Sequence, residues 1–309
     1  MNLVFCGTPA FAVPTLEKLV KAGFEVRLAV TQPDRLRGRG MESAFSPVKQ
    51  KALELQLSIT QPDGIKNNVE FRDQLAAAKP DAIIVVGYGR IIPQWMIDLP
   101  SLGNINLHAS LLPKYRGAAP IQWAIAGGEV MTGVTTMRIN TGLDTGDILL
   151  QKEISIAPGD TALTLGPKLA AIGSEVIIET LRGLQAGTLH PRPQDDKEAT
   201  LAPILRKEDG RIDFHRAAAD ICNRIRGFQP WPGAFTAFRK KNLHIWQAKP
   251  IHREISECEL LVEDGDLFVG CGGNTSLLIT ELQPEGRKRM TAHDFVHGYR
   301  PRNGELLGK

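Results

Sequence analysis

The segment NINLHASLLPKYRGAAPIQWA, residues 104–124, has the pattern of a buried strand that leads through a polar loop into a helix. Because side chains alternate across a strand, Asn104, Asn106 and His108 are expected on one face, with the apolar residues between them on the other. A buried polar group without a partner destabilises a fold by about 1–3 kcal/mol. Either the fold or a ligand must therefore satisfy these three polar side chains.

Short apolar runs alternate with helical patterns around this segment. That alternation predicts a doubly wound α/β domain, with a mostly parallel sheet and helices on both of its faces. The expected strands are residues 3–6, 26–30, 82–86, 103–107, 134–139 and 148–156, and the expected helices are residues 13–22, 47–56, 69–78 and 163–184. Such sheets bind ligands beyond the carboxyl ends of their strands, which is where His108 is expected.

The pattern of the sequence changes after residue 189. We expect a first domain over residues 1–189, a linker over 190–206, where prolines stand in a polar stretch, and a second domain over 207–309. Short strands with close turn signals, including the hairpin dipeptide Asp264–Gly265, predict that the second domain is a smaller, OB-like β-barrel.

The composition is that of an ordinary globular protein, since 42% of the 309 residues are hydrophobic and 23% are charged. No apolar run approaches the roughly 20 residues that span a bilayer. The four cysteines are scattered, which favours neither a disulfide framework nor a zinc site. We therefore expect a cytoplasmic, monomeric protein without a metal. Residues 206–309 hold the excess positive charge, with 17 Lys and Arg against 14 Asp and Glu, which hints at an anionic partner.

Asn106 and His108 form the first candidate site. An amide and an imidazole two residues apart at a strand end can converge on one developing oxyanion. Taken alone, the two residues favour a hydrogen-bonded core histidine beside a structural asparagine. The sequence has no G-x-S-x-G elbow of a serine hydrolase, and FCGTPAF (5–11) has one glycine where a dinucleotide fingerprint has three.

A second candidate is HDFVH, residues 293–297, which places two histidines at metal-ligand spacing on an expected helix. No third ligand is evident nearby in the sequence, and Thr291 has the position of an N-cap. An ordinary amphipathic helix is the favoured interpretation.

Two longer segments, NLHASLLPKYRGAAPIQWA (106–124) and GLDTGDIL (142–149), resemble the signature of the folate-dependent formyltransferases. FCGTPAF, TQPDR, GRG, VVGYGRIIP and FQPWPGA are most similar to the members of that family that act on methionyl-tRNA. The resemblance covers nearly the whole chain. It implies a doubly wound N-terminal domain followed by an OB-like barrel, 10-formyltetrahydrofolate as the donor, and a catalytic set of Asn106, His108 and Asp144.

Formyl transfer to an amine passes through a tetrahedral intermediate whose oxygen becomes negative, so the resemblance implies that Asn106 and His108 stabilise that oxygen. Asp144 could orient His108, stabilise its charge, or relay the proton that the amine releases. The sequence does not divide these roles. Asn104 receives no chemical role from the resemblance and is expected to be structural.

The resemblance also implies folate and tRNA contacts. Folate would contact backbone groups in two loops, at Ser110, Leu111, Leu112, Pro113, Val86, Gly87 and Tyr88. Transfer RNA would contact a long, structureless stretch (31–49), at Arg35, Arg37 and Arg39. Independently of the resemblance, the charge of two C-terminal clusters makes Lys240, Lys241, Arg287 and Lys288 candidates for contacts with the tRNA backbone.

Other interpretations of these charges stay open. The C-terminal clusters, which also contain Arg239 and Arg289, could be solvated turns. Lys114 and Arg116 could attract an anionic ligand or be solvated as well. Trp231 could stack on a base or pack at the domain junction.

Two other functions also stay open at this point. One is a formyltransferase for a nucleotide-linked amino sugar or for glycinamide ribonucleotide, against which RGAAPIQWA, the arginine-rich stretch and FQPWPGA weigh. The other is a noncatalytic tRNA-binding protein, against which the combination of Asn106, His108 and Asp144 weighs.

Overall fold

A computed structural model describes residues 1–37 and 42–308 of the chain. The chain forms two compact units. The first comprises Met1–Pro120, Met131–Ser155 and Gly166–Pro203, and the second comprises Ile121–Val130, Ile156–Leu165 and Ile204–Lys309.

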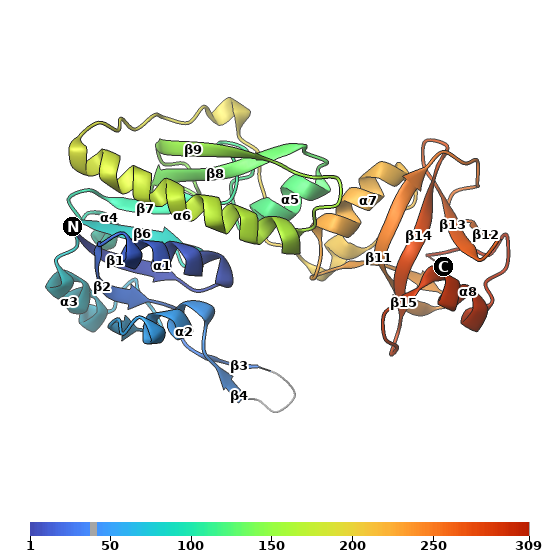
Figure 1. Cartoon of the computed structure of the whole chain (residues 1–309), viewed down its shortest axis with the longest axis horizontal. Helices are drawn as coiled ribbons and strands as arrows, with labels where there is room; N and C mark the ends of the chain where they lie inside the picture. The colour runs from blue at the N-terminus through green and yellow to red at the C-terminus, as the bar shows by residue number, and fades with distance from the viewer. Residues whose placement is uncertain (38–41, 309) are drawn as a thin grey trace. The chain divides into compact units, whose positions relative to one another are not determined.

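A seven-stranded sheet forms the centre of the first unit (Figure 1). Its strands are β1 (Asn2–Gly7), β2 (Glu25–Val30), β5 (Ile59–Thr60), β6 (Ala82–Val86), β7 (Asn104–His108), β8 (Met131–Arg138) and β9 (Ile148–Ser155), in the spatial order β5-β2-β1-β6-β7-β8-β9. The first five strands in that order are parallel, whereas β7 to β8 and β8 to β9 are antiparallel. The predicted mostly parallel sheet is therefore confirmed.

Helices cover both faces of this sheet, as predicted. The helices of the first unit are α1 (Val13–Lys21), α2 (Pro47–Glu54), α3 (Val69–Ala78), α4 (Gln94–Ile97) and, from Gly166 on, α6 (Ala162–Ala186), with short 3-10 turns η1 (Ala10–Ala12) and η2 (Asp196–Glu198). α5 (Pro120–Ala126) belongs to the second unit from Ile121 on. On one face, Phe71 of α3 and Met96 of α4 join a buried cluster with Ile83 of β6. On the other, α6 lies so close to β7 that a Cβ on Gly173 would be 2.7 Å from the side chain of Leu107.

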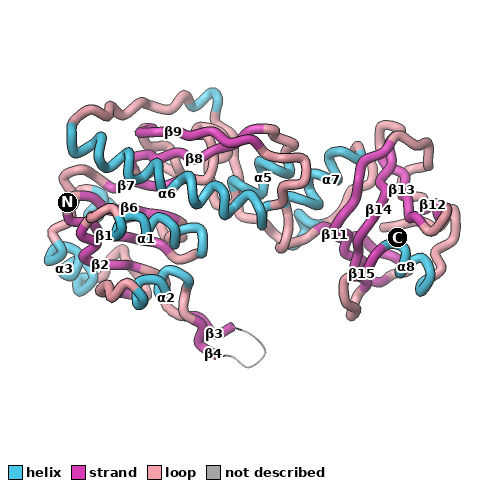
Figure 2. The backbone as a smooth tube through the Cα atoms, in the orientation of Figure 1, coloured by secondary structure: helices cyan, strands magenta, loops and turns pink. Residues whose placement is uncertain are grey.

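The stretch between β2 and α2 is not structureless, so that expectation is wrong. β3 (Arg35–Arg37) and β4 (Glu42–Ala44) pair as an antiparallel hairpin, which Figure 2 shows extending from the first unit. Its strands of three residues carry no apolar run, which is why the sequence pattern gave no strand signal. Arg39 lies outside the described residues.

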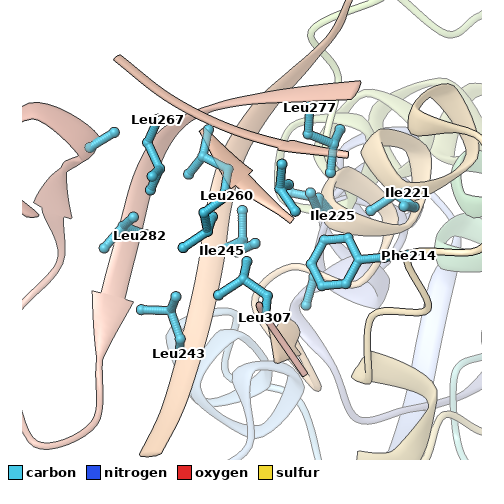
Figure 3. Close-up of a cluster of buried hydrophobic side chains, with 14 of the residues drawn as sticks. Phe214, Ile221, Ile225, Leu243, Ile245, Leu260, Leu267, Leu277, Leu282 and Leu307 are labelled. Atoms are coloured by element: carbon cyan, nitrogen blue, oxygen red, sulfur yellow. The ribbon is translucent and has the colours of Figure 1, made fainter. Parts of the chain in front are cut away.

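The second unit is built on an antiparallel sheet, as expected for the C-terminal domain. Its strands are β10 (Ala234–Phe238), β11 (Lys241–Ile251), β12 (Leu260–Glu263), β13 (Asp266–Cys271), β14 (Thr275–Pro284) and β15 (Met290–Thr291), in the order β10-β11-β14-β13-β12 with β15 beside β14. It also contains η3 (Lys207–Gly210), α7 (Ala218–Gly227) and α8 (Ala292–Tyr299). Figure 3 shows its core, where Ile221 and Ile225 of α7 lie among leucines and isoleucines of the strands.

Two local expectations for this unit are confirmed. Asp264 and Gly265 both have positive φ, of 53° and 86°, in the tight turn between β12 and β13. Thr291 caps α8, because its Oγ1 accepts a hydrogen bond of 3.1 Å from the N–H of Asp294. Within residues 1–37 and 42–308, no group of three or more His, Cys, Asp or Glu side chains is arranged to hold a metal. The described helices include none with the length and apolarity of a membrane span.

Candidate active site

Asn104, the first polar side chain of β7, belongs to the fold rather than to a ligand site. It is buried, and its carboxamide nitrogen donates to the carbonyl oxygens of Met96 and Ile97, at 2.8 and 3.1 Å. These two carbonyl groups belong to the last residues of α4, and the last carbonyls of a helix have no hydrogen-bond partner within it. Asn104 is therefore structural.

His108 is held at the end of β7 by a backbone carbonyl. The side chain is buried, and its Nε2 lies 2.8 Å from the carbonyl oxygen of Tyr115. Because a carbonyl oxygen only accepts hydrogen bonds, Nε2 carries a proton. Tyr115 is itself fixed, since its N–H donates to Thr200 Oγ1 at 2.8 Å. The neutral ring therefore presents the lone pair of Nδ1.

Asp144 faces that nitrogen. Its Oδ2 lies 3.6 Å from His108 Nδ1 and accepts a hydrogen bond of 2.8 Å from the N–H of Gly117. Asp144 has a φ of 52° in the turn between β8 and β9. A Cβ on Gly146 would lie 1.8 Å from the carbonyl oxygen of Arg138, so this turn closes against the end of β8 only with glycine at that position. The fold thus brings the predicted histidine and aspartate together.

Asn106 lies on the same face of β7 as His108. It stands opposite Val85 of β6 and Met137 of β8 and is half-buried. Among the described residues, none hydrogen-bonds its carboxamide. An amide, an imidazole and a carboxylate therefore lie near the end of one central strand. Such a set can donate to an oxygen that gains negative charge and can accept a proton from an attacking group.

The loop after β7 uses much of its polar backbone to hold itself in place. Thr135 Oγ1 donates to the carbonyl oxygen of Ser110 at 2.7 Å and accepts from the N–H of Leu112 at 3.1 Å. Gln151 Nε2 donates to the carbonyl oxygen of Leu112 at 2.8 Å. Fewer backbone groups are thus free for a ligand than the sequence suggested, and folate contacts at Ser110–Pro113 stay a prediction.

The loop after β6 exposes backbone rather than side chains. Val86 is buried, Gly87 has a φ of 57°, and Tyr88 is buried, which raises the pKa of its hydroxyl. Gln32 Nε2 donates to the carbonyl oxygens of Tyr88 and Gly89, at 2.9 and 3.3 Å. Any contact of Val86, Gly87 and Tyr88 with a ligand must therefore use the remaining backbone groups.

A cavity of about 720 Å³ adjoins this loop. It is lined by residues 64–69 together with Arg90 and Ile91. Ile91 is 89% exposed, which is unusual for an isoleucine, and Lys66 and Arg90 bring positive charge to the same wall. An apolar surface beside cations suits a ligand that joins an aromatic ring to carboxylates.

Arg116 is neither solvated nor available to an anionic ligand, so both expectations for it are wrong. It is only 7% exposed, and its guanidinium donates twice to Gln194 Oε1, at 3.0 and 2.8 Å, and to Asp196 Oδ1 at 2.8 Å. Sequence analysis missed Gln194 because it stands in a polar stretch without periodicity, which we expected to be a linker.

Comparison with known proteins identifies the family. Residues 1–181 match the family model described as formyl transferase, and residues 204–300 match that of the formyl transferase C-terminal domain. A methionyl-tRNA formyltransferase of Koribacter versatilis is 64% identical over 309 residues, which cover 100% of this chain and 99% of the relative. The chain belongs to the methionyl-tRNA formyltransferase family.

Other relatives of this formyltransferase agree. A methionyl-tRNA formyltransferase of Acidobacterium capsulatum is 60% identical over 300 residues, 96% of each chain. Among solved structures, the N-formyltransferase from Helicobacter canadensis in complex with folinic acid and dTDP-3-aminofucose matches with a TM-score of 0.67 over 92% of this chain and 99% of that one. At 18% identity, that likeness shows the fold alone.

The C-terminal cations of this formyltransferase differ in whether a carboxylate pairs with them. Lys240 and Lys241, at the β10–β11 turn, and Arg287 and Lys288, after β14, are exposed and make no ion pair within the described chain. The two turns are adjacent, because Asn242 N–H donates to Glu285 Oε2 at 2.9 Å.

The neighbouring arginines of the same formyltransferase are engaged by carboxylates. Arg239 pairs with Glu305 at 2.6 Å, and Arg289 pairs with Glu281 at 3.3 Å while lying over the ring of Trp246. They are thus less available to a ligand than the lysines beside them. Trp231 is 54% exposed.

Proposed function

We propose that this formyltransferase transfers a formyl group from 10-formyltetrahydrofolate to the free amino group of initiator methionyl-tRNA, as a cytoplasmic monomer. The observation that carries the proposal is the separation of 3.6 Å between His108 Nδ1 and Asp144 Oδ2, on the strand face that also presents the free Asn106 carboxamide. The acceptor is supported by relatives at 64% and 60% identity that bear the name methionyl-tRNA formyltransferase.

The geometry supports a division of roles in the proton transfer. Because Tyr115 holds the Nε2 proton, Nδ1 of neutral His108 is the atom that can take a proton from the attacking amine. The ring then becomes cationic, and the carboxylate of Asp144 stabilises that charge. In this proposal, Asp144 assists the transfer through His108.

The oxyanion needs donors that are in place before the reaction. When the amine adds to the formyl carbon, the oxygen of the tetrahedral intermediate becomes negative. We assign Asn106 Nδ2 as the donor that is in place before the reaction, and His108 Nδ1 as a second donor once it has taken the proton of the amine. Donors of this kind each lower the barrier by about 2.7–4 kcal/mol. The intermediate then collapses: the bond between the formyl carbon and the folate nitrogen breaks, and His108 Nδ1 returns the proton to that nitrogen.

The folate supplies the formyl group, and two features of the first unit favour its binding. Backbone groups of the loops at Val86–Tyr88 and Ser110–Pro113 flank the end of the sheet. The cavity beside Ile91 would accept an aromatic ring, with Lys66 and Arg90 attracting carboxylates.

For the tRNA, we assign phosphate contacts to both units. The exposed, unpaired side chains of Lys240, Lys241, Arg287 and Lys288 form one such surface. The other is the arginine-rich stretch between β2 and α2, through Arg35, Arg37 and Arg39. Trp231, half-exposed, is available to stack on a base.

A panel of acceptors tests this function. The purified enzyme is incubated with 10-formyltetrahydrofolate and either initiator methionyl-tRNA, uncharged tRNA, a dTDP-linked amino sugar or glycinamide ribonucleotide. We expect formylation of methionyl-tRNA alone. Preferential formylation of the sugar or of the ribonucleotide would refute methionyl-tRNA as the acceptor. Binding of tRNA without any formylation would refute the proposed activity. The molar mass of the free enzyme, measured by analytical ultracentrifugation, tests whether it is a monomer.

A further inference from the structure

Both the nitrogen and the oxygen of the Gln194 carboxamide are hydrogen-bonded, and the nitrogen bonds the turn that carries Asp144. Its Nε2 donates to the carbonyl oxygens of Asp144 and Gly146, at 2.8 and 2.7 Å. Its Oε1 accepts both hydrogen bonds from the Arg116 guanidinium, at 3.0 and 2.8 Å. One carboxamide therefore links the segment after α6 to the turn and to the loop that follows β7.

The segment that carries Gln194 is anchored on both sides of this link. Before it, Arg192 exchanges two backbone hydrogen bonds of 2.8 Å with Ile148, the first residue of β9. After it, the N–H of Arg116 donates to the carbonyl oxygen of Thr200 at 2.8 Å, and the N–H of Ala202 donates to that of Arg116 at 2.7 Å. The position of Gln194 is thus fixed by backbone pairing rather than by its own side chain.

At its base, the turn is closed by a hydrogen bond of 2.9 Å from the N–H of Arg138 to the carbonyl oxygen of Asp147. Asn140 Oδ1 accepts from the N–H of Gly142 and from Thr145 Oγ1, but both of these bonds lie on its exposed side. Asp144 also adopts a positive φ that residues other than glycine seldom adopt. Among residues 1–37 and 42–308, Gln194 and Gly117 donate hydrogen bonds to Asp144, one to its carbonyl oxygen and one to its carboxylate.

We infer that Gln194 is a positioning residue that holds the Asp144 carboxylate at its distance from His108 Nδ1, with the buried Arg116 fixing the orientation of the Gln194 amide. This inference rests on the proposed function, because it gives Gln194 a role only through Asp144. Displacing a reacting group by about 1 Å can lower a rate by 10²-fold. Loss of the amide donors is therefore expected to lower kcat rather than substrate binding.

The isosteric variant Gln194→Glu separates positioning from anchoring. A carboxylate keeps the acceptor for Arg116 but has no N–H for the carbonyl oxygens of Asp144 and Gly146, and its charge repels them. We expect kcat to fall by about 10- to 100-fold, with KM for both substrates nearly unchanged. The matched control is Asp196→Asn, since Asp196 bonds the same arginine at 2.8 Å but is 83% exposed. Its kcat is expected to stay within about threefold of wild type.

A second measurement does not depend on activity. The N–H of Gly117 donates to Asp144 Oδ2, so its hydrogen exchange reports whether the carboxylate is in place. Exchange of this amide, followed by NMR, is expected to become faster in Gln194→Glu and to stay unchanged in Asp196→Asn. Equal protection in wild type and Gln194→Glu would overturn the inference, as would a wild-type kcat.

Double variants test that the effect passes through Asp144. Once Asp144→Asn has removed the charge, adding Gln194→Glu is expected to lower kcat little further. Losses that multiply would overturn the positioning role. Should Asp144→Asn alone retain full activity, the proposed role of Asp144 fails. Gly117 exchange then still decides whether Gln194 holds the turn.

Discussion

Asn104 and Asn106 stand two residues apart on one face of β7, yet only Asn104 has its carboxamide hydrogen-bonded by the described part of the protein. Asn104 donates to the end of α4 at 2.8 and 3.1 Å, whereas Asn106 has no such partner. The alternating polar pattern of β7 thus contains one structural carboxamide, that of Asn104, and one free carboxamide, that of Asn106. The two residues are therefore a matched pair for separating stability from catalysis.

We expect Asn106→Ala to lower kcat by about 10²-fold or more, because it removes an oxyanion donor. Its midpoint of chemical unfolding is expected to stay close to that of wild type. Asn104→Ala is expected to do the reverse and to lower the free energy of unfolding by about 1–3 kcal/mol, since it leaves buried carbonyls without donors. Steady-state kinetics and urea unfolding of both variants measure the two effects. The assignment fails if Asn106→Ala turns over normally.

His108→Ala is expected to lower kcat by at least about 10²-fold, because the imidazole serves as proton acceptor and as oxyanion donor. His293→Ala is the control, since His293 is exposed on α8 and its Nε2 has His297 as its partner, at 3.2 Å. Single-turnover formylation with saturating substrates measures the chemical step for both. Near-normal turnover by folded His108→Ala would contradict the proposed mechanism.

Arg39→Ala is expected to raise KM for methionyl-tRNA and to leave KM for the folate donor unchanged, because a phosphate contact acts on one substrate only. The matched control is Arg27→Ala, since Arg27 pairs with Glu25 at 3.1 Å within β2. Varying one substrate at a time gives both constants. An unchanged KM for the tRNA would remove Arg39 from the proposed site.

The two C-terminal turns predict a salt effect. Binding of tRNA should weaken linearly on a plot of log affinity against log salt, and each lost phosphate contact should reduce the slope by about 1. Lys240→Ala and Lys288→Ala are expected to show this reduction. Arg289→Ala is expected to leave the slope unchanged, because Glu281 and Trp246 engage that side chain. A slope that no lysine variant changes would place the tRNA elsewhere.

His215 gives a pH-dependent prediction in the second unit. The hydrogen bond and charge of Glu257 raise the pKa of His215 above its ordinary value of 6.5. The pair therefore contributes its full stabilisation at pH values below 6.5. This contribution is lost as the pH rises through the raised pKa of His215. NMR titration should show the His215 pKa falling in Glu257→Gln. An identical titration in both proteins would disprove the coupling.

The regular elements of the first unit followed closely from sequence pattern. The expected helix at 163–184 is α6 (Ala162–Ala186), and the expected strand at 82–86 is β6. The elements that were missed, β5 and α4, have two and four residues, too few to show a period. The β3–β4 hairpin was missed for the same reason.

The site residues, too, were predicted only in part from the sequence. His108 was a candidate from its residue type and its place on the strand, whereas Asp144 was predicted only through the resemblance to formyltransferases; the fold does bring the two together. Arg116 was misjudged because a charge in a polar loop gives no sign of burial, and Gln194 was missed because its partners are backbone carbonyls. Contacts between side chains and distant backbone leave no pattern along the chain.

The pairing of residues 192–202 with the first unit decides where this enzyme can be divided. A truncated chain that stops at residue 189 would leave the buried Arg116 guanidinium without its acceptors on Gln194 and Asp196. A fragment that ends at Pro203, where the first unit ends, retains both of them. Chimeras that exchange C-terminal segments between formyltransferases are therefore better joined after residue 203 than after residue 189.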